Sequence, residues 1–239
     1  QLSAGIAHDF NNMLTVIMGF AELLGMRADV SQTAKDRLKM IVSQGQRGEQ
    51  LIRQILDFSR QASVERRPVD LVPFLGEAVK LLERTLPETI EVVSEVRGGE
   101  SVVNANLTQL QQVITNLAFN ARAAMADGGG LRFELAHLSL EPGNELKIRS
   151  HSAPIVTEVG SGDWVVLTVS DTGDGMSSDV ISRIFEPFYT TKKTGEGTGL
   201  GLSQVYGIVK QHGGYIDVSS AMGKGTTFRI YLPRITEMP

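Results

Sequence analysis

Apolar residues near the start of the chain recur at steps of three and four. They are Leu2, Ile6, Phe10, Met13, Ile17, Phe20 and Leu24. This period predicts an amphipathic helix over residues 2–27 with one buried stripe. A second run predicts a helix over residues 31–62 that starts at the capping residues Ser31 and Thr33. Two such helices joined by a short loop form an antiparallel hairpin, and because one hairpin buries only part of its stripe, we expect a homodimeric four-helix bundle.

The apolar period changes after Arg66, and Pro68 disfavours helix at the residue before it. We therefore expect a helical domain at residues 1–66 and a second domain at residues 67–239. The second domain is predicted to contain helices at 71–84, 107–125 and 202–211, and strands at 90–93, 101–104, 131–138, 164–170, 215–219 and 226–232. Helices mixed with mainly antiparallel strands predict an α+β two-layer sandwich. The polar residues 139–162 are expected to form a hairpin extension or a mobile loop.

The chain has 27 acidic and 23 basic residues, a formal charge of -4, and no cysteine. The acidic balance argues against a nucleic-acid partner. The absence of cysteine removes disulfides and thiolate catalysis and fits a cytoplasmic protein. No apolar run reaches the roughly 18 to 20 residues of a membrane span, so we expect no membrane contact by this fragment. Because Gln1 already lies in a helical pattern, we expect a longer protein, such as a membrane-anchored sensor with this part in the cytoplasm.

His8 lies in the first predicted helix, about 160° around the axis from the apolar stripe. Its imidazole should therefore face solvent, which argues against a histidine buried in a core. Asp9 and Asn12 follow within about one helical turn of it. A nucleophilic ring, a carboxylate and an amide are thus available together on one exposed segment.

Two stretches of the second domain offer oxygen ligands. Asn116 and Asn120 lie four residues apart on one predicted helix, and carboxamide oxygens suit Mg²⁺, although a packing pair is the simpler alternative. Asp171 follows an apolar strand and precedes Gly173 and Gly175. The glycines permit a tight turn against a flat ligand, while the carboxylate can accept from an amine such as that of adenine. A calcium-type or plain turn is the alternative there.

Two further stretches suit a phosphate ligand. Residues 184–193 are aromatic-rich, include Phe188, and end at Lys192 and Lys193, as in a lid whose lysine reaches phosphate; a plain surface loop is the alternative. Residues 197–201 are rich in glycine and lead into a helix, which suits a polyphosphate. A dinucleotide fingerprint is the rival, with Asp217 downstream, but it needs a strand immediately before the glycines.

In their order along the chain, these motifs resemble the H, N, G1, F and G2 boxes of bacterial sensor histidine kinases. The boxes lie at residues 8–12, 116–120, 171–175, 185–188 and 197–201, and residues 223–228 are similar to the last glycine box. The segment around His8 is most similar to hybrid kinases of the CckA type. The resemblance covers nearly the whole chain. It implies a phosphoacceptor and dimerisation hairpin followed by an ATP-binding sandwich of the Bergerat type.

The resemblance also implies a role for each motif. Asn120 would bind Mg²⁺ and Asp171 would read the adenine amine of ATP. The other implied nucleotide-binding residues are Asn116, Gly173, Gly175, Phe188, Lys192, Gly197, Thr198, Gly199, Leu200 and Gly201. Related ATP hydrolases carry Glu where Asn116 stands, and an amide cannot act as general base for water. Bound ATP would therefore stay intact until His8 attacks it.

The implied reaction is autophosphorylation of His8, assisted by Asp9, and transfer of the phosphoryl group to an Asp of a response-regulator receiver domain. Asn12 matches the family position that orients water for the reverse phosphatase reaction. Two alternatives stay open. One is an ATP-hydrolysing protein of the same GHKL fold, and the other is a dimeric phosphotransfer adaptor without catalytic activity. Asn116 and the His8 helix argue against the first, and the intact boxes argue against the second.

Overall fold

The computed structural model divides the chain into two compact units, Gln1–Val64 and Glu65–Pro239. It describes residues 2–27, 29, 31–60, 65–143, 146–149, 156–192 and 197–235. Within these ranges, side chains are described except at residues 2–11, 46–47, 49–60, 147–149 and 156–158. Each unit has its own fold. None of the helices in the described ranges combines the length and the apolar character that crossing a bilayer requires.

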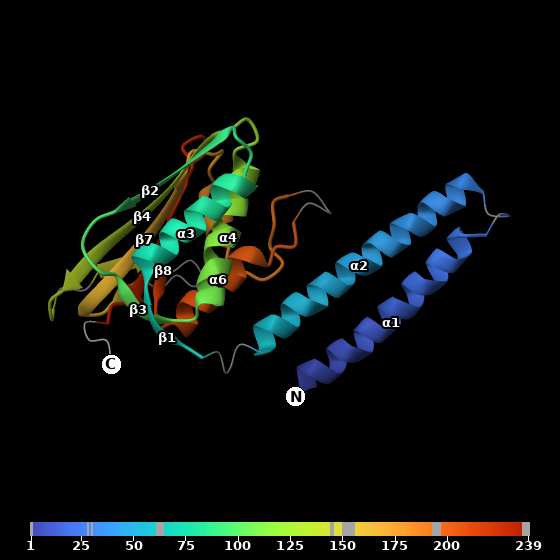
Figure 1. Ribbon diagram of the computed structural model, residues 1–239, viewed down its shortest axis with the longest axis horizontal. Helices are drawn as coiled ribbons and strands as arrows, with labels where there is room; N and C mark the ends of the chain where they lie inside the picture. The colour runs from blue at the N-terminus through green and yellow to red at the C-terminus, as the bar shows by residue number, and fades with distance from the viewer. Residues whose placement is uncertain are drawn as a thin grey trace. The chain divides into compact units, whose positions relative to one another are not determined.

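The first unit is a hairpin of two helices, α1 (Leu2–Gly25) and α2 (Gln32–Arg60), coloured blue to cyan in Figure 1. Side chains of Leu14, Met18 and Ala21 are at least half-buried between the helices. A Cβ on Gly45 would collide with Met18, and one on Gly48 would lie 3.1 Å from Leu14. The small residues of α2 therefore let the two helices approach closely. The predicted antiparallel hairpin is confirmed.

Part of the apolar stripe predicted for α1 stays exposed in the single chain. Met13, Ile17 and Phe20 are more than half exposed, and Leu24 is 45% exposed. The hairpin contact instead uses the neighbouring row that contains Met18. A row of large apolar side chains is thus left on the outside of the hairpin.

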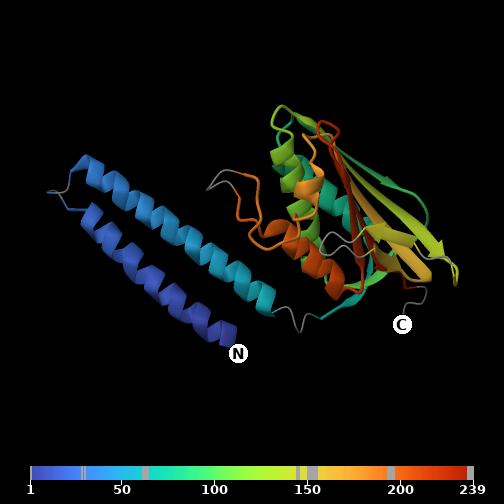
Figure 2. The ribbon, with the colours of Figure 1, turned by 180° about the vertical axis from the view of Figure 1, so that it is seen from behind.

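The second unit is an α+β sandwich, as predicted. Its five-stranded sheet has the order β2-β4-β7-β9-β8 and is antiparallel except for the parallel pair β2 and β4. The strands are β2 (Ile90–Val96), β4 (Gly129–Leu140), β7 (Gly162–Asp171), β8 (Tyr215–Ser220) and β9 (Thr226–Pro233). The long helices are α3 (Leu71–Thr85), α4 (Leu107–Ala124) and α6 (Gly201–Gln211). All three cover the same face of the sheet (Figures 1 and 2).

Alternation along the strands explains the two layers. Leu131, Phe133 and Leu135 of β4 are fully buried and belong to the main core under the helices. Because successive side chains of a strand point to opposite faces, the residues between them lie on the other face of the sheet. There Arg132 pairs with Glu95, and Glu134 pairs with Arg97.

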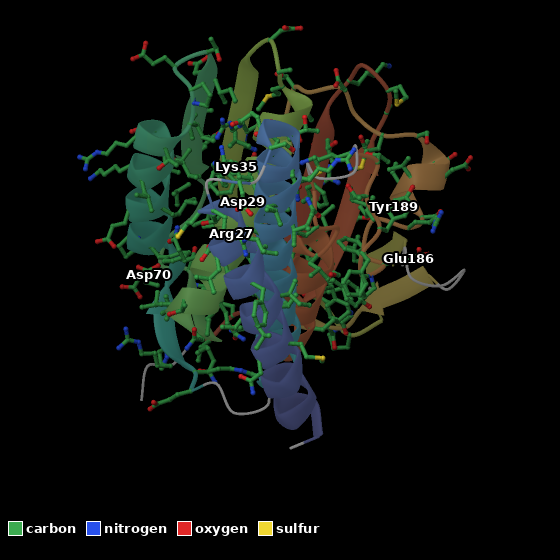
Figure 3. The ribbon with its side chains drawn as sticks, turned by 90° about the vertical axis from the view of Figure 1, so that its right-hand side faces the viewer. Arg27, Asp29, Lys35, Asp70, Glu186 and Tyr189 are labelled. Atoms are coloured by element: carbon green, nitrogen blue, oxygen red, sulfur yellow. The ribbon has the colours of Figure 1, made fainter. Side chains whose placement is uncertain are left out.

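A strand that the sequence pattern did not predict, β1 (Arg67–Asp70), pairs antiparallel with β3 (Val102–Ala105). Asp70, labelled in Figure 3, ends this strand and caps α3, because its Oδ1 accepts from Val72 N at 3.0 Å and from Ser101 N at 3.1 Å. The change of pattern that the sequence shows at Pro68 thus coincides with the first strand of the second unit.

The insert contains a hairpin of its own. Strands β5 (Leu146–Arg149) and β6 (Val156–Val159) form a separate two-stranded antiparallel sheet. Val159 is fully buried in a second small core with Trp164, whose Nε1 donates to the carbonyl of Gly160 at 3.1 Å. Of the two structures expected for this insert, the described strands form a hairpin.

Candidate nucleotide site and phosphoacceptor helix

Asp171 lies at the carboxyl end of β7, where the strand turns toward α5 (Ser178–Ile181). Its Oδ1 accepts from Gly173 N at 2.9 Å and from Thr226 N at 3.2 Å. Burial raises the pKa of the Asp171 carboxyl above its ordinary value, while these two hydrogen bonds act in the opposite direction. Both bonds use the same oxygen, which fixes the carboxylate and leaves Oδ2 as the acceptor for a ligand.

The turn after Asp171 is packed against the end of α4. A Cβ on Gly173 would lie 2.6 Å from the carbonyl oxygen of Ala124, and Asp174 N donates to that same carbonyl at 3.0 Å. Gly175 follows with a φ of +68° and lies against the backbone of Ala221. The predicted tight turn therefore exists, and the close approach of α4 explains why its first glycine has no room for a side chain.

The two carboxamides of α4 face the start of α6. Asn116 Nδ2 donates to the carbonyl of Gly201 at 3.2 Å and to Gln204 Oε1 at 3.4 Å. A Cβ on Gly201 would lie 3.7 Å from Asn116 Oδ1 and 3.8 Å from Asn120 Nδ2. The structure thus brings Asn116, Asn120 and the end of the glycine-rich segment together, and both Asn side chains stay partly accessible.

The first turn of α6 differs from those of its neighbours. Helices α3, α4 and α5 have side-chain caps from Asp70, Asn106 and Ser177 respectively. At α6 the cap position is Leu200, which supplies no side-chain hydrogen bond. The first N–H groups of a helix need partners and carry its positive dipole end, so an uncapped start beside a glycine-rich segment suits a phosphate.

Phe188 and Gly199 close the base of the segment between them. Phe188 N donates to the carbonyl of Gly199 at 3.0 Å. Both residues have a φ of +67°, and a Cβ on Gly199 would collide with the Phe188 backbone. Phe185 is buried, and the centre of its ring lies 5.3 Å from the centre of the Tyr206 ring. Phe188, in contrast, is 56% exposed. The aromatic-rich stretch therefore has one anchored ring and one exposed ring.

The remaining residues of the predicted lid lie on the same segment. Lys192 is exposed, its N–H donates to Thr190 Oγ1 at 3.2 Å, and Gly197 packs against both side chains. Thr198 Oγ1 accepts from Leu200 N at 3.4 Å. The predicted alternative Lys193 lies outside the described residues.

Arg183 also contacts the predicted lid segment. Its Nε lies 3.0 Å from Glu186 Oε2, and its guanidinium lies 4.3 Å from the centre of the Tyr189 ring. Glu186 and Tyr189 are labelled in Figure 3. Because Arg183 and Glu186 are more than half exposed, this ion pair adds little stability by itself.

The phosphoacceptor candidates lie on α1. His8 and Asp9 are in the helix, but their side chains fall outside the described part of the chain. Asn12 is exposed and follows His8 by four residues, which places both positions on one helix face. The structure thus gives the helical spacing of His8 and Asn12.

The described residues argue against the dinucleotide-binding alternative. Residues 172–192, which follow β7, contain α5 and turns but no strand. Asp217 lies on β8 and faces Arg229, with 3.5 Å between Oδ2 and Nη1. It therefore serves an ion pair on the sheet.

Sequence reasoning missed Gln204, the polar partner of Asn116. Gln204 lies one turn into α6 and is only 6% exposed. In the sequence it stands between the predicted glycine-rich motif and the apolar residues that follow. The one available signal was a polar residue beside Val205 in a helix that packs against a core.

The donor set fits a magnesium ion that travels with a nucleotide. Across the described residues there is no group of three or more His, Cys, Asp or Glu that could hold a metal. Asn120 offers a carboxamide oxygen, and Mg²⁺ commonly combines one or two protein oxygens with water and substrate phosphates. The phosphates would therefore supply most of its ligands.

Comparison with known proteins follows the same division of the chain. Residues 105–236 match the family described as histidine kinase-, DNA gyrase B-, and HSP90-like ATPase, and residues 1–63 match the His Kinase A (phospho-acceptor) domain. The chain therefore belongs to this ATPase family, and the phospho-acceptor domain in front of it defines a sensor histidine kinase core.

Two curated relatives align over almost the whole chain. Sensor kinase CckA of Brucella abortus (strain 2308) is 41% identical over 237 residues, which are 99% of this chain and 24% of the relative. Sensor histidine kinase ZraS of Escherichia coli (strain K12) is 30% identical over 235 residues, which are 98% of this chain and 45% of the relative. The chain thus spans less than half the length of either protein.

Two solved structures show the same fold. Full-length ShkA in complex with AMPPNP has a TM-score of 0.68 at 24% identity, with 100% of this chain and 46% of that chain covered. Histidine kinase ThkA in complex with response regulator protein TrrA has a TM-score of 0.61 at 23% identity, with 98% and 61% covered.

Proposed function

We propose that this chain is an ATP-dependent protein-histidine kinase that phosphorylates His8 and passes the phosphoryl group to an Asp of a response-regulator receiver domain. The observation that supports it most is that Asn116 and Asn120 of α4 face the uncapped start of α6, while the end of the same helix packs against the turn after Asp171. In this proposal residues 1–66 provide dimerisation and phosphotransfer, and residues 67–239 bind ATP.

These elements provide a separate group for each part of the nucleotide. Asp171 Oδ2 accepts from the adenine amine, and the start of α6, with Gly197, Thr198 and Leu200 before it, receives phosphates. Asn120 supplies an oxygen to Mg²⁺, which neutralises charge on the phosphates during transfer. Phe188 and Lys192 belong to the lid over them.

Asn116 explains why water does not compete for the γ-phosphate. Its NH₂ group donates to Gly201 and Gln204, and an amide has no basic site that could take a proton from water. Bound ATP therefore persists until a better nucleophile arrives.

His8 is that nucleophile. One nitrogen of the neutral imidazole attacks the γ-phosphorus, the bond from that phosphorus to the β,γ-bridging oxygen breaks, and ADP leaves with the electron pair. Asp9 accepts a hydrogen bond from the other ring nitrogen and stabilises the positive ring that forms. The phosphoramidate then transfers its phosphoryl group to a receiver carboxylate.

The partners follow from the hairpin and from relatives. The exposed row that includes Met13, Ile17 and Phe20 would be covered by a second copy, which gives a homodimeric four-helix bundle. ThkA was solved with a response regulator, and ShkA with AMPPNP, which support the receiver partner and the nucleotide.

A second activity is favoured by Asn12. Its exposed amide lies one turn from His8 and can orient a water molecule toward the phosphoryl group of a docked receiver. We propose that the chain also acts as a phosphatase. Asn12→Ala should then slow receiver dephosphorylation while it leaves autophosphorylation intact.

The kinase proposal is tested with ATP labelled at the γ-phosphate. The wild-type chain should gain label that is stable in alkali and labile in acid, and it should pass the label to a purified receiver domain. His8→Ala should gain none, whereas His151→Ala serves as the matched control and should label normally. Label that survives in His8→Ala, or rapid phosphate release without labelled protein, would refute the proposal.

A further inference from the structure

Helices α4 and α6 are joined by a row of carboxamides. Gln109 Nε2 donates to Gln211 Oε1 at 3.1 Å, Gln112 Nε2 donates to Gln204 Oε1 at 3.2 Å, and Asn116 Nδ2 donates to that same oxygen at 3.4 Å. The two helices lie side by side on the sheet in both views (Figures 1 and 2). One end of this amide row reaches the candidate nucleotide site, and the other end reaches the last turn of α6.

The orientations of the Asn116 and Gln204 amides are fixed from the end of the row at the site. The carbonyl of Gly201 can only accept a hydrogen bond, so the group of Asn116 that lies 3.2 Å from it must be the NH₂. The same NH₂ faces Gln204, which must therefore present its oxygen. Gln204 is nearly inaccessible to solvent, so no water replaces this oxygen easily.

We infer that Gln204 is a positioning residue of the nucleotide site. It holds the Asn116 carboxamide with its NH₂ toward α6, so that the oxygen stays available next to Asn120. Since Asn116 is partly accessible, this oxygen can be reached by a magnesium-bound or phosphate-bound water. The inference rests on the proposed function, because it concerns how this site receives ATP.

Loss of Gln204 should therefore act on the site more than on the fold. Without Gln204 Oε1, one proton of the Asn116 NH₂ loses its acceptor, and the side chain is held by the Gly201 carbonyl alone. A net hydrogen bond of this kind corresponds to an affinity change of about three- to tenfold. Gln211 provides the matched comparison, because it belongs to the same row two turns further along α6 and bonds Gln109 instead.

The test uses the 239-residue chain with Gln204→Leu and, as control, Gln211→Leu. The side-chain NH₂ resonances of Asn116 are recorded by NMR without nucleotide, and the affinity for a magnesium complex of a non-hydrolysable ATP analogue is measured by calorimetry. Gln204→Leu should shift these resonances and weaken binding about three- to tenfold. Gln211→Leu should change neither, and Gln204→Glu, which keeps an acceptor oxygen, should retain the hydrogen-bonded resonance.

Unchanged resonances and affinity in Gln204→Leu would overturn the inference, and so would an equal loss of affinity in Gln211→Leu. Thermal unfolding identifies a variant that does not fold, and Gln204→Met, with an unbranched side chain of similar length, then replaces Gln204→Leu. If the wild-type chain binds the analogue but forms no phosphohistidine, the kinase proposal fails. The role of Gln204 is still decided by the NMR and binding data.

Discussion

Exchange of one oxygen of Asp171 for an NH₂ group tests the proposed role of this side chain in binding adenine. In the wild-type chain, Asp171 Oδ1 accepts from Gly173 N at 2.9 Å and from Thr226 N at 3.2 Å. The side-chain oxygen of Asp171→Asn can still accept from both groups. The free energy of unfolding should therefore change by less than about 1 kcal/mol. The atom that faces the ligand becomes a donor, however, and a donor cannot bind the adenine amine.

The loss should be large in binding. A hydrogen bond to a charged group contributes about 1.5–3 kcal/mol, which corresponds to roughly a 10- to 150-fold weaker affinity. Asp171→Ala should differ, because it leaves two backbone N–H groups without their acceptor and should destabilise the domain by about 2 kcal/mol or more. The contrast between the two variants separates recognition from folding.

The assay combines calorimetric titration with an ATP analogue and urea unfolding of each variant. Asp217→Asn is the control, because it changes a carboxylate of the same sheet that faces Arg229. It should bind the nucleotide normally. Wild-type affinity in Asp171→Asn, or a loss of affinity as large in Asp217→Asn, would refute the assigned role.

The pH dependence gives an independent check on Asp171. Because burial raises the pKa of its carboxyl in the folded state, the folded chain takes up this proton at a higher pH than the unfolded chain. The contribution of this group to stability therefore falls as pH rises through the window just above the ordinary range of Asp. Nucleotide affinity should instead fall as pH is lowered through that window, and Asp171→Asn should remove both dependences.

Three more predictions concern the lid, the dimer and a buried histidine. Gly199→Ala should weaken nucleotide binding and cost about 1–2 kcal/mol of stability from its positive φ, whereas Gly160→Ala, at an open position, should do neither. Phe20→Glu should shift the chain from dimer to monomer in analytical ultracentrifugation, whereas Met222→Glu, at an exposed residue of the second unit, should not. Burial lowers the pKa of His212 in the folded state, so the unfolded state binds its proton more readily and stability to urea should fall as pH drops below the ordinary value of 6.5.

Each of these has a contrary outcome. Normal binding by Gly199→Ala would mean that the backbone contact between this glycine and Phe188 has no part in the lid. A dimer that withstands Phe20→Glu would place the dimer contact elsewhere. His212 Nε2 accepts a hydrogen bond from Asn106 N and cannot do so once it is protonated. If His212→Phe nevertheless keeps the same dependence of stability on pH, then protonation of another group destabilises the domain.

The sequence by itself determined most of the elements and the residues of the candidate site. Period and capping residues are local properties, so the helices at α1, α2 and α4 were predicted to within a few residues of their ends. Motif residues such as Asp171 and Asn116 were identifiable because the turns and helix faces that present them are also local. The buried role of Gln204 was not, since it depends on a partner 88 residues away.

Only the tertiary structure decided which distant segments meet. The strand β1 was missed because its hydrogen-bond partners in β3 lie more than 30 residues further along the chain, and Pro68 gives no local strand signal. The insert was ambiguous for a similar reason, because its hairpin depends on a second small core around Trp164. Likewise, the period of α1 predicts an apolar row, but the packing of α2 decides which row the hairpin buries and which is left for a partner.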